Sequence, residues 1–355
     1  MHMADALVSP AVGGTMWAVS AGLIGYSCKK VSLDLDEQRV PLMGVMGAFV
    51  FAAEMINFAI PGTGSSGHLG GGLLLAALLG PSAAFLTMVS VLIVQAVFFA
   101  DGGLLALGCN IFNLGFLPCF VAYPLIFKKL TNKQHLTHRR IVAASTLSAV
   151  TGLQLGALAV VLQTTLSDIS ALPLLTFAVM MQPIHLAIGI VEGVATAAVI
   201  LFVSNARPEL LNMAGGRTRA TGGPGRLLAV LAVSTLLIGG VVSWFASSRP
   251  DGLEWAIAAV AGTEEIGATS DLHTVSSTVQ EATALLPDYD FSDTGTAPVP
   301  DAPHSVISSG TSAAGILGGG LTLILAGALA VLFRRRRRNG PEQPDAPASS
   351  GDIAA

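Results

Sequence analysis

The 355-residue chain is 52% hydrophobic and only 11% charged, with a mean hydropathy of +0.69. Soluble globular proteins carry about a quarter charged residues, so this composition excludes an ordinary cytosolic enzyme and indicates an all-α polytopic membrane protein. The net charge of −4 comes with short basic clusters that flank apolar stretches. A continuous basic patch is missing from that pattern, which argues against nucleic-acid binding.

Nine apolar stretches follow one another along the chain. Most approach the roughly 20 helical residues that cross the ~30 Å hydrocarbon core of a bilayer. The stretch 69–80 is the exception, because a helix of that length rises only about 18 Å, and we expect it to be a partial span enclosed by protein. The predicted spans are 11–28, 41–60, 69–80, 83–100, 103–127, 140–166, 173–203, 227–246 and 313–333.

Positive charge predicts the orientation of these spans, because cytosolic flanks are enriched in Lys and Arg. Seventeen of the 18 basic residues fall on one side if the stretch 69–80 counts as a crossing, and Arg249 is the exception. The sequence therefore predicts a multi-pass protein of the cell membrane with its N-terminus outside and its C-terminus in the cytosol. The loop that holds His68, the turn at Asp101 and an acidic segment at 247–312 are then external.

Composition divides the chain into four parts. Residues 1–204 hold seven predicted spans, and residues 227–338 hold two more, which enclose the external segment 247–312. The Gly- and Arg-rich stretch 205–226 has the composition of a flexible cytosolic linker. The Pro-, Ala- and Ser-rich stretch 339–355 has that of a disordered cytosolic tail.

A stripe of small residues runs along the first predicted span. Gly14, Ala18 and Gly22 recur every four residues, which permits close contact between helices. We interpret the stripe as internal packing in preference to packing against a partner membrane subunit.

The chain opens with Met-His, which is a ready chelator wherever the terminal amine is free. No basic region or small-residue cleavage site accompanies the first span, so we expect no signal peptide and a mature chain that begins at Met1. The Met1 amine, the deprotonated His2 amide and the His2 imidazole can fill three adjacent corners of a plane around a metal ion. The imidazole of His68 could fill the fourth. Four planar nitrogen atoms suit Ni(II) or Cu(II), whereas Zn(II) prefers a tetrahedron, so this geometry favours nickel or low-spin cobalt over zinc. The residues alone also allow His2 to be an exposed terminal residue and His68 an ordinary loop residue.

Further polar residues lie near the external ends of the predicted spans. Such groups are costly in a membrane and face an interior, so they are candidates for orienting His2 and His68; hydrogen bonding within the bundle, away from the metal, is the alternative. These candidates are Glu54, Asn57, Asp101, Asn110 and Asn113. His185 lies roughly 18 Å deep on the seventh span. That depth excludes a site shared directly with His68 unless the loop descends into the bundle, so we favour a packing or gating pair of His185 and Glu192 over a metal ligand.

Four sequence segments in order resemble the signatures of the CbiM/NikM family: MHMADALVSP, PGTGSSGHLGGGLLLAALLGP, QAVFFADGG and QPIHLAIGIVEG. The family comprises the substrate-binding membrane subunits (S-components) of nickel and cobalt energy-coupling-factor transporters. The resemblance covers about residues 1–204 and implies a seven-helix bundle in which Met1, His2 and His68 hold the metal. Ala6 stands where the family usually has Gly, a difference that bears on how the N-terminal segment folds into the helical bundle.

The second part resembles the NikN-type auxiliary component, because SSRPDGLEWAIA carries its PDGLE motif just after a span. Together the resemblances imply a fused subunit of an ATP-driven importer that captures Ni(II) or Co(II) outside the cell. The partners would be a transmembrane coupling subunit and cytosolic ATPases, since this chain has no GxxxxGK[ST] phosphate loop. The metal would be transported cargo, with no permanent cofactor, and the sequence does not choose between nickel and cobalt.

Two other functions remain as alternatives. Gly64-Ser65-Ser66-Gly67 fits a G-x-S-G pattern, so an intramembrane serine protease with a Ser66–His185 dyad can be written. The difference in membrane depth between the two residues argues against it. An autonomous secondary transporter for a small solute is the second alternative, which uptake by this chain alone would support.

Overall fold

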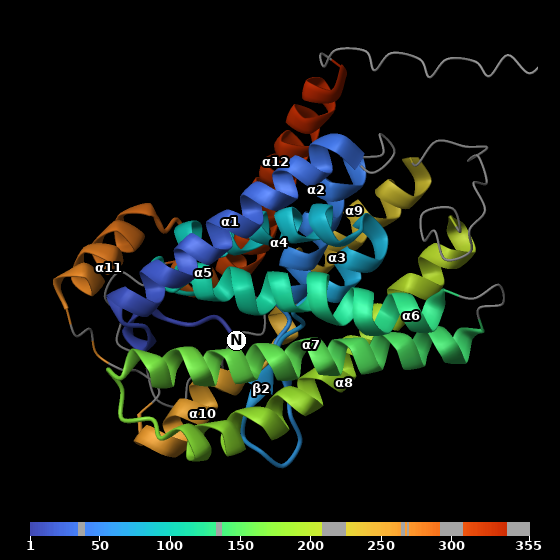
Figure 1. Ribbon diagram of the computed structural model, residues 1–355. Helices are drawn as coiled ribbons and strands as arrows, with labels where there is room; N and C mark the ends of the chain where they lie inside the picture. Colours follow the sequence, from blue (N-terminus) through green and yellow to red (C-terminus); the bar gives the residue numbers. More distant parts are fainter. Residues whose placement is uncertain are drawn as a thin grey trace, which may run out of the picture.

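The computed structural model describes residues 1–34, 40–132, 137–207, 225–263, 267, 270–291 and 308–338. The predicted tail and most of the predicted linker, residues 208–224, lie outside the described residues. The described chain is mostly helical (Figure 1). Its elements, in chain order, are η1 (Asp5–Leu7), α1 (Pro10–Asp34), α2 (Val40–Glu54), β1 (Phe58–Ala59), β2 (Ser66–Gly67), α3 (Gly72–Leu79), α4 (Pro81–Phe98), α5 (Leu107–Asn110), η3 (Ile111–Phe127), α6 (Lys128–Thr131), α7 (His138–Ser167), α8 (Leu174–Ala206), α9 (Gly225–Gly240), η5 (Val242–Phe245), α10 (Gly252–Ala261), α11 (Asp271–Thr283), η6 (Pro287–Tyr289) and α12 (Ser309–Arg338).

Local sequence signals mark the starts of several helices. Pro10 and Pro81 are the first residues of α1 and α4, where the missing N–H of proline costs nothing and its fixed φ suits a helix. Gly80 ends α3 and precedes α4 with a φ of 81°, a left-handed value that glycine adopts without strain. The Thr137 side chain accepts a hydrogen bond from the Arg140 amide and caps α7.

Helices cover the central part of each predicted span. Five of the described helices are long and apolar enough to cross a bilayer: α4, the continuous helix Leu107–Thr131 formed by α5, η3 and α6, α7, α8, and Ser309–Arg334 of α12. The apolar helices α2 and α9 have only 15 and 16 residues, and α3 has 8. The fold class is therefore that of a helical, multi-pass membrane protein, whereas the number of crossings stays a prediction.

The outer faces of the long helices are apolar. Leu147, Leu162 and Leu166 on α7, and Leu175 and Val179 on α8, are all exposed. Apolar surface of this extent on a water-soluble protein would drive association. In a bilayer the same side chains contact lipid, which fits the composition of the chain.

Close helix contacts use glycine, as expected for a membrane bundle. Helices α7 and α8 lie side by side (Figure 1), and a Cβ added at Gly193 would lie 2.3 Å from the Cα of Thr146. The stripe of Gly14, Ala18 and Gly22 on α1 is different, because all three residues are exposed. Apart from the adjoining residues and backbone of α1 itself, no described atom lies within 4 Å of a Cβ built at Gly14 or Gly22. Our interpretation of this stripe as internal packing is therefore wrong for the described residues.

The described residues of the acidic segment 247–312, predicted to be external, fold back onto the first part of the chain. Helix α11 packs against η1 and α4, and its His273 Nε2 donates to the carbonyl of Val8 at 2.9 Å. The side-chain amide of Gln280 donates to the carbonyl of Gly102 at 2.7 Å. The main-chain amide of Leu285 donates to the carbonyl of Phe98 at 2.8 Å. The segment thus binds both the N-terminal stretch and the loop after α4, which are the two stretches that approach the candidate site.

Candidate metal site

The first three residues enter the protein interior, where hydrogen bonds to the main chain of Met3 hold them. The Met3 amide donates to Asn110 Oδ1 at 2.8 Å, and the Met3 carbonyl accepts from Asn110 Nδ2 at 3.2 Å. The same carbonyl accepts from the Gly103 amide at 2.9 Å. Met1 is only 5% exposed, so the terminal amine lies inside the protein.

A hairpin brings His68 to the same place. Strands β1 and β2 pair antiparallel, and the chain after β2 descends between the helices, where the Gly70 amide donates to Glu192 on α8 at 2.8 Å. Gly67 packs against Ile188, since an added Cβ would lie 2.5 Å from that side chain. The loop that carries His68 therefore enters the helical bundle. This is the condition under which His185 could share a site with His68.

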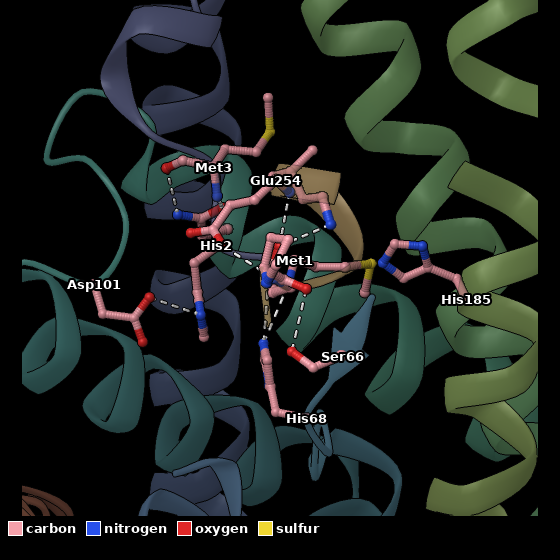
Figure 2. A network of polar contacts seen from close by, with 12 residues as sticks. Met1, His2, Met3, Ser66, His68, Asp101, His185 and Glu254 are labelled. Carbon is pink, nitrogen blue, oxygen red and sulfur yellow. Dashed lines mark hydrogen bonds and ion pairs between the residues drawn. The ribbon is translucent and has the colours of Figure 1, made fainter. Parts of the chain in front are cut away.

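The amine and the two histidine rings form one cluster (Figure 2). The nitrogen of Met1 lies 3.3 Å from His68 Nε2. The rings of His2 and His68 stack with centroids 5.1 Å apart and an interplanar angle of 3°. His68 Nδ1 lies 3.1 Å from the Leu69 carbonyl; because a carbonyl only accepts, Nδ1 carries the hydrogen and Nε2 presents its lone pair to the amine.

Two carboxylates flank this cluster. Asp101, in the loop after α4, contacts His2 Nδ1 through Oδ1 at 3.0 Å. Asp251 contacts the Met1 amine through Oδ2 at 3.1 Å and lies 3.9 Å from His68 Nε2. His2 Nε2 is buried and has no hydrogen-bond partner among the described residues.

Burial and charge set the protonation states around the amine. Burial, the Met1 ammonium and the His2 ring lower the pKa of His68 to about 3, so this imidazole is neutral at physiological pH. Burial raises the pKa of Asp251, but the Met1 ammonium and His68 outweigh it and hold that pKa below its usual range. The pKa of Asp101 is also lowered, because His2 and the Tyr289 hydroxyl outweigh the effect of burial. The neutral histidine can therefore ligate a metal, while both carboxylates stay charged.

Two cavities adjoin the cluster. A space of about 10 Å³, roughly one water molecule in size, is lined by Met1, His68, His185 and Asp251 among others. A cavity of about 820 Å³ opens beside His2 and His68. Its walls include the predicted candidates Glu54, Asn57 and Asp101, together with Asp251, Glu254 and Asp288.

The remaining candidates lie around the cluster at different distances. Asn110 holds the main chain of Met3, and Asn113 exchanges two hydrogen bonds with Gln163, at 2.8 and 3.0 Å, beneath the Met3 side chain. Glu54 accepts a hydrogen bond from Gln95 at 2.7 Å and leaves Oε1 buried without a partner among the described residues. None of these contacts joins the amine or an imidazole directly, so the three residues shape the surroundings of the cluster.

His185 and Ser66 do not form a hydrolytic pair. The Ser66 hydroxyl donates to the carbonyls of Arg249 and Pro250, at 2.7 and 3.2 Å, and His185 Nδ1 donates to the Met181 carbonyl at 2.8 Å. The His185 ring points at the side chain of Met1 (Figure 2). The serine therefore serves the loop contact with the second part of the chain.

Sequence reasoning missed Asp251 and Tyr289. The PDGLE motif itself marked Asp251, yet its partner lies 250 positions away, and nothing in the order of residues connects them. The Tyr289 hydroxyl donates a hydrogen bond to Asp101. Tyr289 lies in a stretch without a motif, so the sequence gives no signal for this contact. Among the described residues, no three His, Cys, Asp or Glu side chains form a metal-ligating group.

Two family models, several relatives and a solved structure match this chain. The family model described as cobalt uptake substrate-specific transmembrane region (CbiM) matches residues 2–210, and that of the PDGLE domain matches residues 225–335. A metal transport protein of Haloquadratum walsbyi is 37% identical over 59% of this chain and 93% of its own length. A fused nickel transport protein, NikMN, of Archaeoglobus fulgidus is 31% identical over 65% of this chain and 73% of its own. A crystal structure of a truncated transition metal transporter aligns with a TM-score of 0.51 and 32% identity, covering 58% of this chain and 99% of that one.

Proposed function

Because the chain belongs to the CbiM family of cobalt-uptake substrate-specific transmembrane regions, we propose that it is the substrate-capturing membrane subunit of an importer for Ni(II) or Co(II). Relatives that, like this chain, carry a second component are named as fused nickel transport proteins, and others are named as cobalt transport proteins. Both metals accept nitrogen ligands. The chain is thus a transport subunit, and the metal is its cargo.

One observation carries the proposed site. The Met1 amine lies 3.3 Å from His68 Nε2, although 67 positions separate the two residues, and the His2 ring stacks on that of His68. The proposed donors are the Met1 amine, the His2 amide, the His2 imidazole and the His68 imidazole. The first three close a five-membered and a six-membered chelate ring, which fixes them in one plane.

The His2 ring must turn when the metal enters. Its Nδ1 atom is the one that closes the six-membered ring, and in this structure it contacts Asp101. Rotation about the bond between Cβ and the ring is soft, so the ring can exchange Asp101 for the metal by turning. Asp101 then serves to hold the ring in place before the metal arrives.

The division into units, the orientation in the membrane and the partner subunits are part of the same proposal. Residues 1–204 would form the seven-helix metal-binding unit and residues 227–338 a two-span unit, with the N-terminus outside the cell. Transport would need a membrane coupling subunit and ATPases, since this chain has no phosphate loop. The exposed stripe of Gly14, Ala18 and Gly22 on α1 offers a close-packing face to such a coupling subunit.

The experiment is to move the amine while leaving every side chain intact. Two glycines are placed before Met1, because a single extra residue would let the new amine, two amides and the His2 ring bind metal without His68. Nickel affinity of the purified protein is measured by calorimetry, with the N-terminus checked by mass spectrometry. We expect a loss larger than the roughly 10–100-fold that outer groups contribute. Unchanged affinity would refute the site, and His68→Ala tests the fourth donor separately.

A further inference from the structure

The PDGLE motif is built into the candidate site through its aspartate. Asp251 Oδ1 accepts from the amides of Leu253 and Glu254 at 2.7 and 2.8 Å and caps helix α10. The Glu254 carboxylate accepts from the Asp251 amide at 2.9 Å, which completes a capping box. Since Oδ1 is fully used by the cap, Oδ2 is fixed in direction, and it is this atom that contacts the Met1 amine at 3.1 Å.

The motif is also fastened to the loop that carries His68. The Ser66 amide donates to the Pro250 carbonyl at 2.8 Å, and the Ser66 hydroxyl donates to the Arg249 carbonyl at 2.7 Å. A Cβ added at Gly252 would lie 3.2 Å from the His185 ring, so the turn is seated against α8 as well. The carboxylate therefore approaches the amine from a rigid support.

A second contact from the external segment reaches the other end of the Met-His dipeptide. The Tyr289 hydroxyl donates to Asp101 Oδ2, and Asp101 Oδ1 contacts His2 Nδ1 at 3.0 Å. The Tyr289 ring stacks on Phe99 with centroids 5.1 Å apart. Phe99 directly precedes the loop that carries Asp101, so this contact fixes the loop as well as the carboxylate.

We propose that Asp251 is a positioning residue of the metal site, so that residues 1–204 bind metal with full affinity only when the PDGLE turn of the second unit is in place. Asp251 seats the amine beside His68, whereas the Tyr289–Asp101 pair holds His2 only before the metal arrives, because His2 Nδ1 must leave Asp101 to ligate it. The proposal rests on the proposed function of the Met1, His2 and His68 cluster, and it assigns the PDGLE unit a role in loading the metal. A coordinated amine keeps two N–H groups, so Asp251 can accept from one of them after the metal has bound.

The test uses two substitutions that keep the fold in the full-length chain. Asp251→Asn removes the charge while keeping a side chain that caps helices equally well. Tyr289→Phe removes one hydroxyl and keeps the stack on Phe99. Asp271→Asn is the matched control, because it removes one charge from an exposed position of the same external segment. Nickel affinity, stoichiometry and the visible spectrum of the nickel-loaded protein are measured for each.

We expect Asp251→Asn to weaken nickel binding by about 10–100-fold, as removal of a group that orients a ligand does. Tyr289→Phe should not weaken nickel binding, because Asp101 must release His2 Nδ1 before the metal binds. Stoichiometry and the spectrum at saturation should stay those of the wild type, and Asp271→Asn should bind within twofold of it. An affinity of Asp251→Asn within twofold of the wild type would overturn the proposal, as would reduced stoichiometry with unchanged affinity, which indicates a misfolded fraction. If the chain with two added glycines binds normally, the proposed function fails; if only that chain loses nickel, the present proposal fails alone.

Discussion

Asn110→Ala removes the side chain that holds the main chain of Met3, and it touches neither the amine nor an imidazole. Asn110 accepts from the Met3 amide at 2.8 Å and donates to the Met3 carbonyl at 3.2 Å. After the substitution the carbonyl still accepts from the Gly103 amide. The buried Met3 amide, however, loses the acceptor that the asparagine supplied.

The size of the effect follows from that one donor. Leaving a buried N–H unsatisfied costs about 1–3 kcal/mol, which corresponds to a factor of about 5–150 in an equilibrium. The cost falls on the state in which the N-terminal segment is seated. Apparent metal affinity equals the intrinsic affinity multiplied by the seated fraction, so we expect nickel binding to weaken by up to about 100-fold.

Calorimetric nickel titration of the purified variant measures this loss. Thr151→Ala is the control, because the Thr151 hydroxyl is exposed and donates only to the carbonyl of Leu147 in its own helix. We expect the control to bind as the wild type does. Wild-type affinity for Asn110→Ala, combined with a lowered melting temperature, would refute the reasoning, since it would show that seating of Met3 is not linked to metal capture.

Three further predictions concern pH, the loop and the alternative function. Coordination displaces a proton from the His2 amide, so nickel affinity should fall by about tenfold for each pH unit by which the solution is made more acidic. His68, with a pKa of about 3, adds nothing near neutrality, and nickel titrations between about pH 6 and 8 that show no pH dependence would contradict this. Glu192→Ala should destabilise the protein by about 1–3 kcal/mol by orphaning the Gly70 amide, whereas Glu192→Gln keeps an acceptor and should cost less; equal losses in thermal unfolding would count against the contact. Ser66→Ala should keep nickel binding within a few-fold while His2→Ala abolishes it, and the reverse pattern would favour the protease.

The sequence was sufficient for the helical membrane class and for the residues of the cluster. Apolar stretches predict helices well because a bilayer leaves the backbone few other ways to satisfy its polar groups. His68 could be connected with Met1 because charge asymmetry placed both on one face and a resemblance named them together. The structure brings Met1, His2 and His68 into one cluster; that they bind metal remains the proposal.

Packing and long-range pairing could not be read from the sequence. The stripe of Gly14, Ala18 and Gly22 has the spacing of a buried helix contact, yet spacing does not say which face meets a neighbour. His185 was assigned a depth from the helix rise alone, which ignores the descent of the loop that carries His68. Asp251 was noticed only as part of a motif, because a contact across 250 positions leaves no local signal.

X-ray absorption at the metal edge of nickel-loaded, full-length protein tests the central claim most directly, because it reports the ligands of the metal itself. The proposed chelate predicts four-coordinate, planar nickel with nitrogen ligands only, and loss of that spectrum in His68→Ala. A six-coordinate, oxygen-rich spectrum that His68→Ala leaves unchanged would contradict the claim. It would place the metal among the carboxylates of the adjoining cavity.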